Sequence, residues 1–288
     1  MKMDRILFGD NQFFGVNHMS EEKARAQAMK FQDLDEIMTV LRSAYDNGIT
    51  TFMCTTHARI GDVIERMKQE PDAWSKQTFY PCMPYAHKYA NAMTEDGMLG
   101  AIKKFLPDSG LFDAALRGTR SLATKDIEGI TTLLIDAEMK MFDGFPTPVI
   151  FLQNVVVDLL LGLGFKDAFA IFADHVKSKY RAEPGFITMN LPLCLETLDT
   201  VGIENPIVCS NINKIGFRMS GGLDAYEQAI ATHEFRAIAM SVFASGALSP
   251  SEALDWLKLQ GIDSFVFGAS SGHNIRSTRE IATSVWAS

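Results

Sequence analysis

Eight short apolar runs, each followed by a segment with helical spacing, constrain the fold of this chain more than any other feature. Strand and helix patterns that alternate in this way are typical of α/β folds with a parallel sheet, and eight repeats favour a (β/α)8 TIM barrel. A doubly wound open sheet is the main alternative, although no Gly-x-Gly-x-x-Gly follows the first run, as it does in a dinucleotide-binding sheet. The expected strands are Ile6–Gly9, Ile49–Cys54, Thr78–Met83, Val149–Leu152, Phe186–Met189, Ile207–Cys209, Ala237–Val242 and Phe265–Phe267.

The spacing of these runs predicts one barrel domain over residues 1–288, with residues 84–147 as a lid-like insertion. The third and fourth runs are much further apart than any other neighbouring pair, and long connections of this kind often form lids. A hydrophobic content of 47% and a charged content of 22% are ordinary for globular proteins. The chain therefore has enough apolar side chains to fill a sizeable core.

Net charge and cysteine use restrict the partners and the compartment. A net charge of −8 argues against nucleic acid or an anionic membrane as the main partner, but allows a small anionic ligand in a locally positive site. The four cysteines form no Cys-x-x-Cys pair, and the N-terminus lacks the apolar segment of a signal peptide. We therefore expect a soluble cytoplasmic protein. The apolar run Val155–Phe165 could belong to the core or to a subunit contact, which leaves a homo-oligomer open.

The residues at the carboxyl ends of the expected strands should form the active site of such a barrel. His57 and His87 follow neighbouring strands, and histidine is the commonest acid–base residue near neutral pH, so these two are the candidate catalytic residues. Asp10 is the one strand-end carboxylate that could act as a general base, although it could equally form a turn. Polar residues expected to orient a substrate are Asp10, Asn11, Asn154, Asn190, Asn211 and Lys214.

An anion-binding site is predicted where the last apolar run breaks into small residues. Small residues before a helix leave backbone N–H groups exposed at its N-terminus, where the helix dipole favours a phosphate. A simple strand-to-helix turn with a serine N-cap is the alternative. The expected phosphate-binding or cofactor-binding residues come from the ends of the seventh and eighth runs and from the last helix: Ser241, Ser245, Gly246, Gly268, Ala269, Ser270, Ser271 and Arg276.

Sulfur and imidazole ligands occur together near the second and third runs. Cys54, His57, Cys82 and His87 could supply soft metal ligands, but their spacing is not that of a known zinc module. The same residues could form a cysteine nucleophile with a histidine base, which is no more specific. We therefore predict no metal site.

Several segments, taken in order, are similar to a known family. Gly48–Phe52, Gly185–Asn190 and Ser241–Leu248 resemble the second, fifth and seventh strand regions of the aldo/keto reductase superfamily, and Gly268–Ser271 with Arg276 resembles its cofactor-phosphate region. The resemblance covers most of the chain and implies a TIM barrel with NADP or NAD as cofactor. The positions that would grip the nicotinamide cofactor are Asn190, Ser241, Gly246, Gly268, Ser270, Ser271 and Arg276.

The family's catalytic Asp, Tyr, Lys and His are not expected at their usual places in this chain. Met53 stands where the Asp should follow Phe52, and no Tyr lies within residues 54–61. Pro84 lies near the position of the Lys, and Gln153 or Asn154 replaces the His. We therefore expect an enzyme of this ancestry with a replaced catalytic set. Its substrate would be a small metabolite, which could carry a phosphate group because a phosphate-binding site is expected. The alternatives are a non-catalytic nucleotide- or phosphate-binding protein and, ranked lower, a lyase or isomerase.

Overall fold

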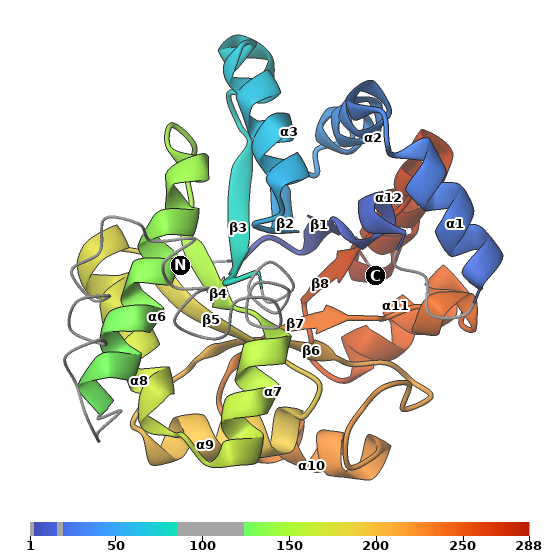
Figure 1. Ribbon diagram of the computed structural model, residues 1–288. Helices are drawn as coiled ribbons and strands as arrows, with labels where there is room; N and C mark the ends of the chain where they lie inside the picture. Colours follow the sequence, from blue (N-terminus) through green and yellow to red (C-terminus); the bar gives the residue numbers. More distant parts are fainter. Residues whose placement is uncertain (1–2, 16–19, 86–123, 288) are drawn as a thin grey trace.

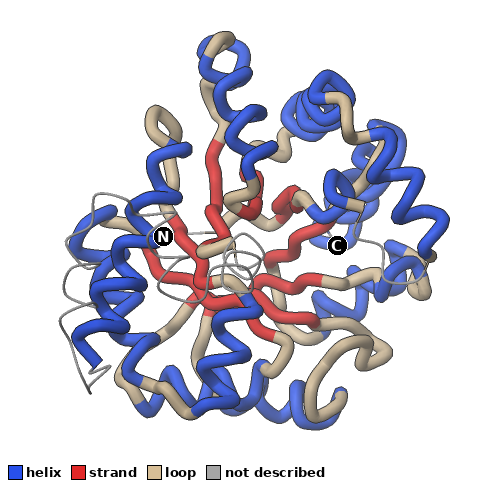
Figure 2. The backbone as a smooth tube through the Cα atoms, in the orientation of Figure 1, coloured by secondary structure: helices blue, strands red, loops and turns tan. Residues whose placement is uncertain are grey.

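The eight strands close into a parallel barrel in which each strand pairs with its neighbours in sequence order, and β1 pairs with β8. The computed structural model describes residues 3–15, 20–85 and 124–287. The (β/α)8 barrel is confirmed and the doubly wound sheet is wrong; Figure 2 shows the strands gathered inside a ring of helices. The strands are β1 (Ile6–Gly9), β2 (Thr51–Thr55), β3 (Thr78–Met83), β4 (Val149–Leu152), β5 (Glu183–Thr188), β6 (Ile207–Asn211), β7 (Arg236–Met240) and β8 (Ser264–Phe267).

The helices lie outside the barrel and connect successive strands (Figure 1). Of the expected insertion at 84–147, residues 86–123 lie outside the described residues, while α6 (Thr124–Met139) and the short turn η3 (Lys140–Phe142) precede β4. The other helices are α1 (Glu21–Lys30), α2 (Leu34–Asp46), α3 (Ala58–Lys68), α7 (Asn154–Leu163), α8 (Asp167–His175), α9 (Leu191–Thr200), α10 (Leu223–Thr232), α11 (Pro250–Leu259) and α12 (Gly272–Ala287). Short turns are η1 (Asn11–Phe14), η2 (Pro71–Trp74), the π-helical η4 (Val176–Tyr180) and η5 (Ala244–Gly246).

Local sequence explains where these helices begin and end, as α2 illustrates. The side chain of Asp33 accepts a hydrogen bond from the Asp35 N–H and so caps the first turn. The helix stops before Gly48, whose φ of 78° is the left-handed conformation that favours glycine after a helix. The apolar face between these ends is buried against the barrel through Ile37, Val40, Leu41 and Ala44.

The barrel interior is a packed core, because alternate side chains of each strand point inward. The inward cluster contains Leu7, Met53, Tyr80, Phe151 and Ile187 among its members. The Phe151 ring fits because its neighbour on β5 is Gly185, where an added Cβ would overlap that ring. The interior is therefore tightly filled below the mouth, where the carboxyl ends of the strands meet.

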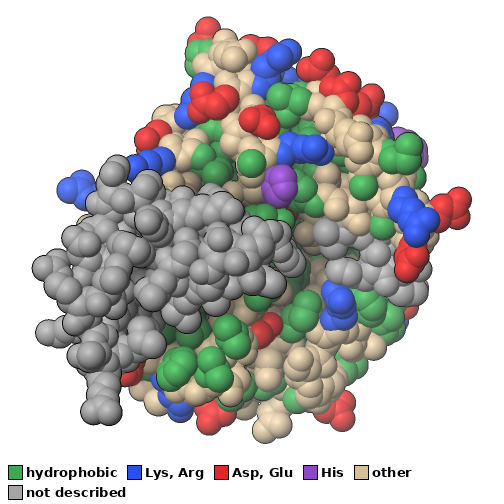
Figure 3. All heavy atoms as spheres, viewed as in Figure 1, with side chains coloured by type: hydrophobic (Ala, Val, Ile, Leu, Met, Phe, Trp, Pro, Cys, Tyr) green, Lys and Arg blue, Asp and Glu red, His purple; other side chains and the backbone are tan. Residues whose placement is uncertain are grey.

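One helix is less buried than its apolar sequence indicates. Val157 is the buried apolar residue of α7, while Val155, Leu159 and Leu163 are 47%, 58% and 57% exposed. The helix thus contributes to the core through Val157, with Val156 and Leu160 packed against that core, and the use of its exposed face as a subunit contact stays a prediction. Figure 3 shows hydrophobic side chains in green in the region where Figure 1 places α7. Among the described helices, none has the length and apolar character needed to cross a membrane.

Candidate functional site

The end of β1 places a buried carboxylate against the end of β2. Asp10 is only 6% exposed, and its Oδ2 accepts hydrogen bonds from the backbone N–H of Thr55 at 2.8 Å and from its hydroxyl at 2.7 Å. Burial raises the pKa of Asp10, and the two bonds from Thr55 offset part of that rise. Asp10 therefore holds a proton more readily than an ordinary Asp, which suits a group that transfers one.

A second buried carboxylate reaches the same region from α6. Glu138 is 2% exposed and accepts a hydrogen bond from the Thr56 hydroxyl. Its two carboxylate oxygens also lie 3.3 and 3.2 Å from the Tyr85 backbone nitrogen, which donates to them. Consecutive threonines at the end of β2 thus donate to two different carboxylates: Thr55 to Asp10, and Thr56 to Glu138.

His57 lies in an aromatic setting at the start of α3. Its ring centroid is 4.5 Å from that of Phe14 and 5.4 Å from that of Tyr85. The Nδ1 atom accepts the backbone N–H of Arg59 at 3.0 Å, so a neutral ring carries its proton on Nε2. Burial and the Arg59 charge lower the pKa of His57, while Asp62 opposes them. At neutral pH this histidine is therefore a neutral hydrogen-bond donor. Its expected partner His87 lies outside the described residues, so the convergence of the two stays a prediction.

The ionisable groups around Asp10 are held in their neutral forms. Burial raises the pKa of Tyr85, and the Asp10 charge raises it further. Burial likewise raises the pKa of Cys54 and Cys82 well above their usual range, with Asp10 contributing to both. A cysteine nucleophile needs a lowered thiol pKa, so these two thiols do not favour the lyase or isomerase alternative.

The turn after β7 is unusual in its backbone. Ser241, Ala244 and Ser245 have φ values of 55°, 44° and 59°, and Gly246 follows at 95°. Left-handed backbone in non-glycine residues is costly and is often found where a ligand is held. Ser241 is half-buried, while Ser245 and Gly246 are exposed.

The end of β8 lies against the turn after β1. A Cβ at Gly268 would overlap the Gln12 Oε1 atom, so glycine at this position leaves room for the Gln12 side chain. Gln12 is 5% exposed, and its Nε2 donates to the Gly9 carbonyl at 2.7 Å. Its Oε1 has no hydrogen-bond partner within the part of the chain that the structure describes. Gln12 therefore lies between Asp10 and the Gly268–Ser271 loop, where the phosphate site is predicted.

The loop from Gly268 to Ser271 leads directly into α12, as expected. The Ser271 hydroxyl accepts the Asn274 backbone N–H at 3.3 Å, so the serine N-cap is present. Ala269 and Ser270 are half-buried, and the Ser270 carbonyl accepts a hydrogen bond from Lys30 Nζ at 3.1 Å. Arg276 is exposed in the first turns of α12.

Other residues predicted to orient a substrate are dispersed around the mouth. Asn190 caps α9 by accepting the Leu193 N–H at 3.3 Å, and the buried Asn211 donates to the Arg218 carbonyl at 2.9 Å. Lys214 points to α11, where it pairs with Glu252 at 2.6 Å. Asn11 is exposed in η1, and Asn154 is the first residue of α7. Asn190, Asn211 and Lys214 thus use their side chains to hold helix ends and loops around the barrel mouth.

Two residues of the mouth, Glu138 and Lys30, were not identified from the sequence as site residues, and a third, Tyr85, was identified only by its place after a strand. Glu138 lies within a long helical pattern far from any strand end, and Lys30 ends a polar helix, so neither carries a local signal. Tyr85 does carry one, since it follows the end of β3 by two residues. Its place beside His57 depends on packing that spacing alone does not reveal.

Comparison with solved structures supports the fold over nearly the whole chain. A protein from Pseudomonas aeruginosa assigned to the aldo-keto reductases shares 12% identity and a TM-score of 0.63, covering 99% of this chain and 92% of that one. The thermostable aldo-keto reductase Tm1743, in complex with the inhibitor epalrestat, shares 10% identity and a TM-score of 0.60, covering 98% and 91%. A mutant of Gox0644 in complex with NADPH shares 8% identity and a TM-score of 0.56, covering 97% and 83%. No protein-family model and no curated protein matches the chain.

Proposed function

We propose that this chain is an oxidoreductase that transfers hydride between NADPH or NADH and a small carbonyl compound, using a proton-transfer set of its own. The observation that carries the proposal is the buried Asp10, whose charge acts on Tyr85 of the His57–Tyr85 ring pair, at the same end of the barrel as the Gly268–Ser271 loop. The likeness of the fold to aldo-keto reductases supports it, as does NADPH bound to Gox0644.

The proton chemistry follows from the protonation states of the three side chains. A bound nicotinamide cofactor would supply the hydride that reaches the carbonyl carbon. The carbonyl oxygen then needs one proton, and Asp10, whose pKa is raised by burial, is the group that gives it up. The neutral His57 would donate from Nε2 to the developing oxyanion, and the Tyr85 hydroxyl would donate beside it. In the reverse direction Asp10 takes the proton back.

The cofactor phosphate would lie at the N-terminus of α12. Backbone N–H groups there, the Arg276 guanidinium and the Lys30 ammonium at the Ser270 carbonyl favour an anion. This is the site at which we expect a small anionic ligand to bind. A phosphorylated substrate and a homo-oligomer stay predictions, because no described contact bears on either.

Arg276→Ala is expected to weaken NADPH binding by about 10-fold to 100-fold, because a charge-assisted hydrogen bond contributes about 1.5–3 kcal/mol. A thermal-shift titration measures this. Wild-type protein at 100 times the dissociation constant should gain about 2.7 kcal/mol in free energy of unfolding.

The control for this experiment is Arg66→Ala, which removes an exposed arginine of α3 that pairs with Asp35. That variant should bind NADPH like the wild type. Equal affinity of the Arg276 variant and the wild type would remove Arg276 from the site. No thermal shift with NADPH or NADH would overturn the oxidoreductase proposal, and binding without hydride transfer to any aldehyde or ketone would favour the non-catalytic alternative.

A further inference from the structure

Two acidic side chains on α6 point in opposite directions. Asp136 and Glu138 are two positions apart, which places them about 200° apart around a helix of 3.6 residues per turn. Asp136 faces α8 and η4, while Glu138 faces the barrel mouth. The last turns of α6 thus connect a cluster on the outside of the barrel to the candidate active site.

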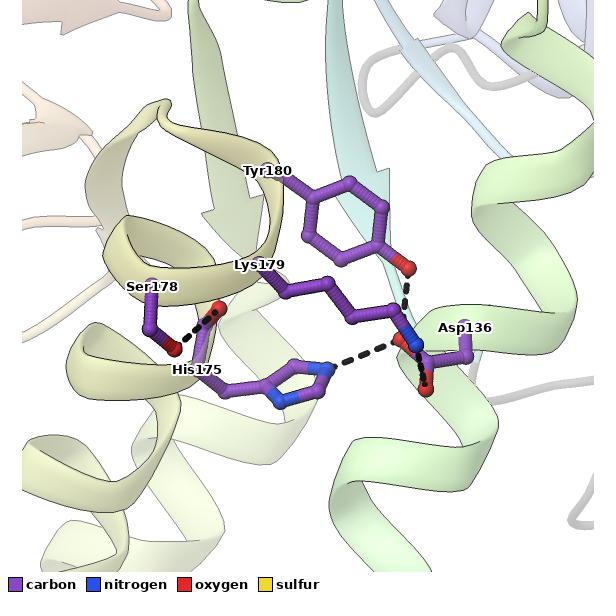
Figure 4. A network of polar contacts seen from close by, with 5 residues as sticks. All are labelled: Asp136, His175, Ser178, Lys179 and Tyr180. Atoms are coloured by element: carbon purple, nitrogen blue, oxygen red, sulfur yellow. Dashed lines mark hydrogen bonds and ion pairs between the residues drawn. The ribbon is translucent and has the colours of Figure 1, made fainter.

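The outer cluster surrounds one carboxylate with three donors, as Figure 4 shows. Asp136 Oδ1 lies 2.8 Å from His175 Nε2 and 2.5 Å from the Tyr180 hydroxyl, and its Oδ2 lies 2.6 Å from Lys179 Nζ. Burial raises the pKa of Asp136, but hydrogen bonds from Lys179, Tyr180 and His175 outweigh it and leave that pKa lowered. Asp136 is therefore charged at neutral pH and ties α6 to the α8–η4 segment.

The inner carboxylate joins the loops that follow β2 and β3. Glu138 accepts from the Thr56 hydroxyl and from the Tyr85 backbone N–H, and it is 2% exposed. Thr56 directly precedes His57, and the Tyr85 ring packs on the His57 ring. Glu138 thus bonds to the backbone of one ring residue and to the neighbour of the other.

We propose that Glu138 is a positioning residue of the active site. It holds Tyr85 and His57 in place relative to each other, and the Asp136 cluster in turn holds Glu138 in place. This inference rests on the proposed function for its catalytic consequence, although the contacts on which it is built are independent of that function. Glu138 acts through Tyr85 and Thr56 and need not touch the substrate. A displacement of about 1 Å in a reacting group can cost about 100-fold in rate.

The activity test compares Glu138→Ala with Glu138→Gln. The Ala variant removes every acceptor and should lower kcat by about 10-fold to 100-fold, while the KM for NADPH stays within about 2-fold of wild type. The Gln variant keeps an oxygen for the Tyr85 N–H and should recover most of the rate. Glu196→Ala, at an exposed position of α9, is the matched control and should leave both constants unchanged. A wild-type kcat in folded Glu138→Ala protein would overturn the proposal.

A second measurement tests the positioning role without turnover. In protein labelled with 13C in its tyrosine rings, the Tyr85 signal is assigned by its loss in Tyr85→Phe. Glu138→Ala should shift or broaden that signal, Glu138→Gln should shift it less, and Glu196→Ala should leave it in place. An unchanged Tyr85 signal in Glu138→Ala would overturn the inference. A wild-type protein that transfers no hydride would refute the proposed function alone, because the tyrosine spectrum would still decide the role of Glu138.

Discussion

Replacing Asp10 with Asn is expected to lower the rate of carbonyl reduction by about 100-fold to 10,000-fold, because general acid–base catalysis contributes about that much. Asn keeps an oxygen that can accept the two hydrogen bonds from Thr55, so the end of β2 should stay in place. It cannot give up a proton to the substrate oxygen. Steady-state rates of NADPH oxidation with an aldehyde substrate measure the loss.

The same substitution should raise stability at neutral pH. The folded-state pKa of Asp10 is raised, so the folded chain binds the proton more tightly than the unfolded chain, in which an Asp titrates at about pH 3.9. Stability of the wild type therefore falls as pH rises through the interval between the unfolded and the folded pKa. Below about pH 4 both states are protonated and the difference disappears. The Asp10→Asn variant should melt at a higher temperature than wild type at pH 7, and this gain should shrink at acidic pH.

The matched control for Asp10→Asn is Asp174→Asn, at an exposed position of α8. That variant should show the wild-type rate and the wild-type dependence of melting temperature on pH. If Asp10→Asn keeps the wild-type rate while its melting temperature rises, Asp10 is a strained structural residue and the proton comes from another group. If neither quantity changes, the raised pKa assigned to Asp10 is wrong.

The sequence predicted the barrel because its elements end at residues with strong local preferences. Strands β1, β3 and β4 occur at the predicted bounds, and Pro84 directly follows β3. Strand β5 differs because it begins at Glu183, three residues before the expected Phe186. Pro184 and Gly185 have low strand propensity, yet both are paired with β4 in the barrel. Pairing with a neighbouring strand decides whether such positions are extended, and local propensity carries no information about that pairing.

The candidate site was predictable only where one residue's local position defines its role. His57 follows β2 and caps α3 through the Arg59 N–H, a contact between residues two apart in sequence. Glu138 is 82 residues from Thr56 and 53 from Tyr85, so nothing in the local pattern of α6 could indicate that it reaches the mouth. The exposure of one face of α7 could not be predicted for a related reason. An apolar helix pattern does not show which side of the helix packs on the barrel.

Gly185→Ala is expected to destabilise the fold by about 3 kcal/mol, at the upper end of what overpacking a core usually costs. The added Cβ would overlap atoms of the Phe151 ring, inside a barrel whose neighbouring side chains are buried. The ring cannot move aside without displacing those neighbours, because protein interiors are close-packed. Urea unfolding followed by circular dichroism measures the change.

Two further variants separate overpacking from the intrinsic cost of changing a glycine. Gly162 lies in α7, and a methyl group added there would have nothing within 4 Å, so Gly162→Ala should stabilise by about 0.5–1 kcal/mol through helix propensity. Phe151→Leu makes room for the new methyl group, so the double variant Gly185→Ala with Phe151→Leu should be more stable than the sum of the two single changes allows. Additive effects would mean that the methyl group at position 185 and the Phe151 ring never compete for the same space. In that case the barrel interior beneath the site would be looser than these contacts require, and the placement of Asp10 and Tyr85 above it would need another support.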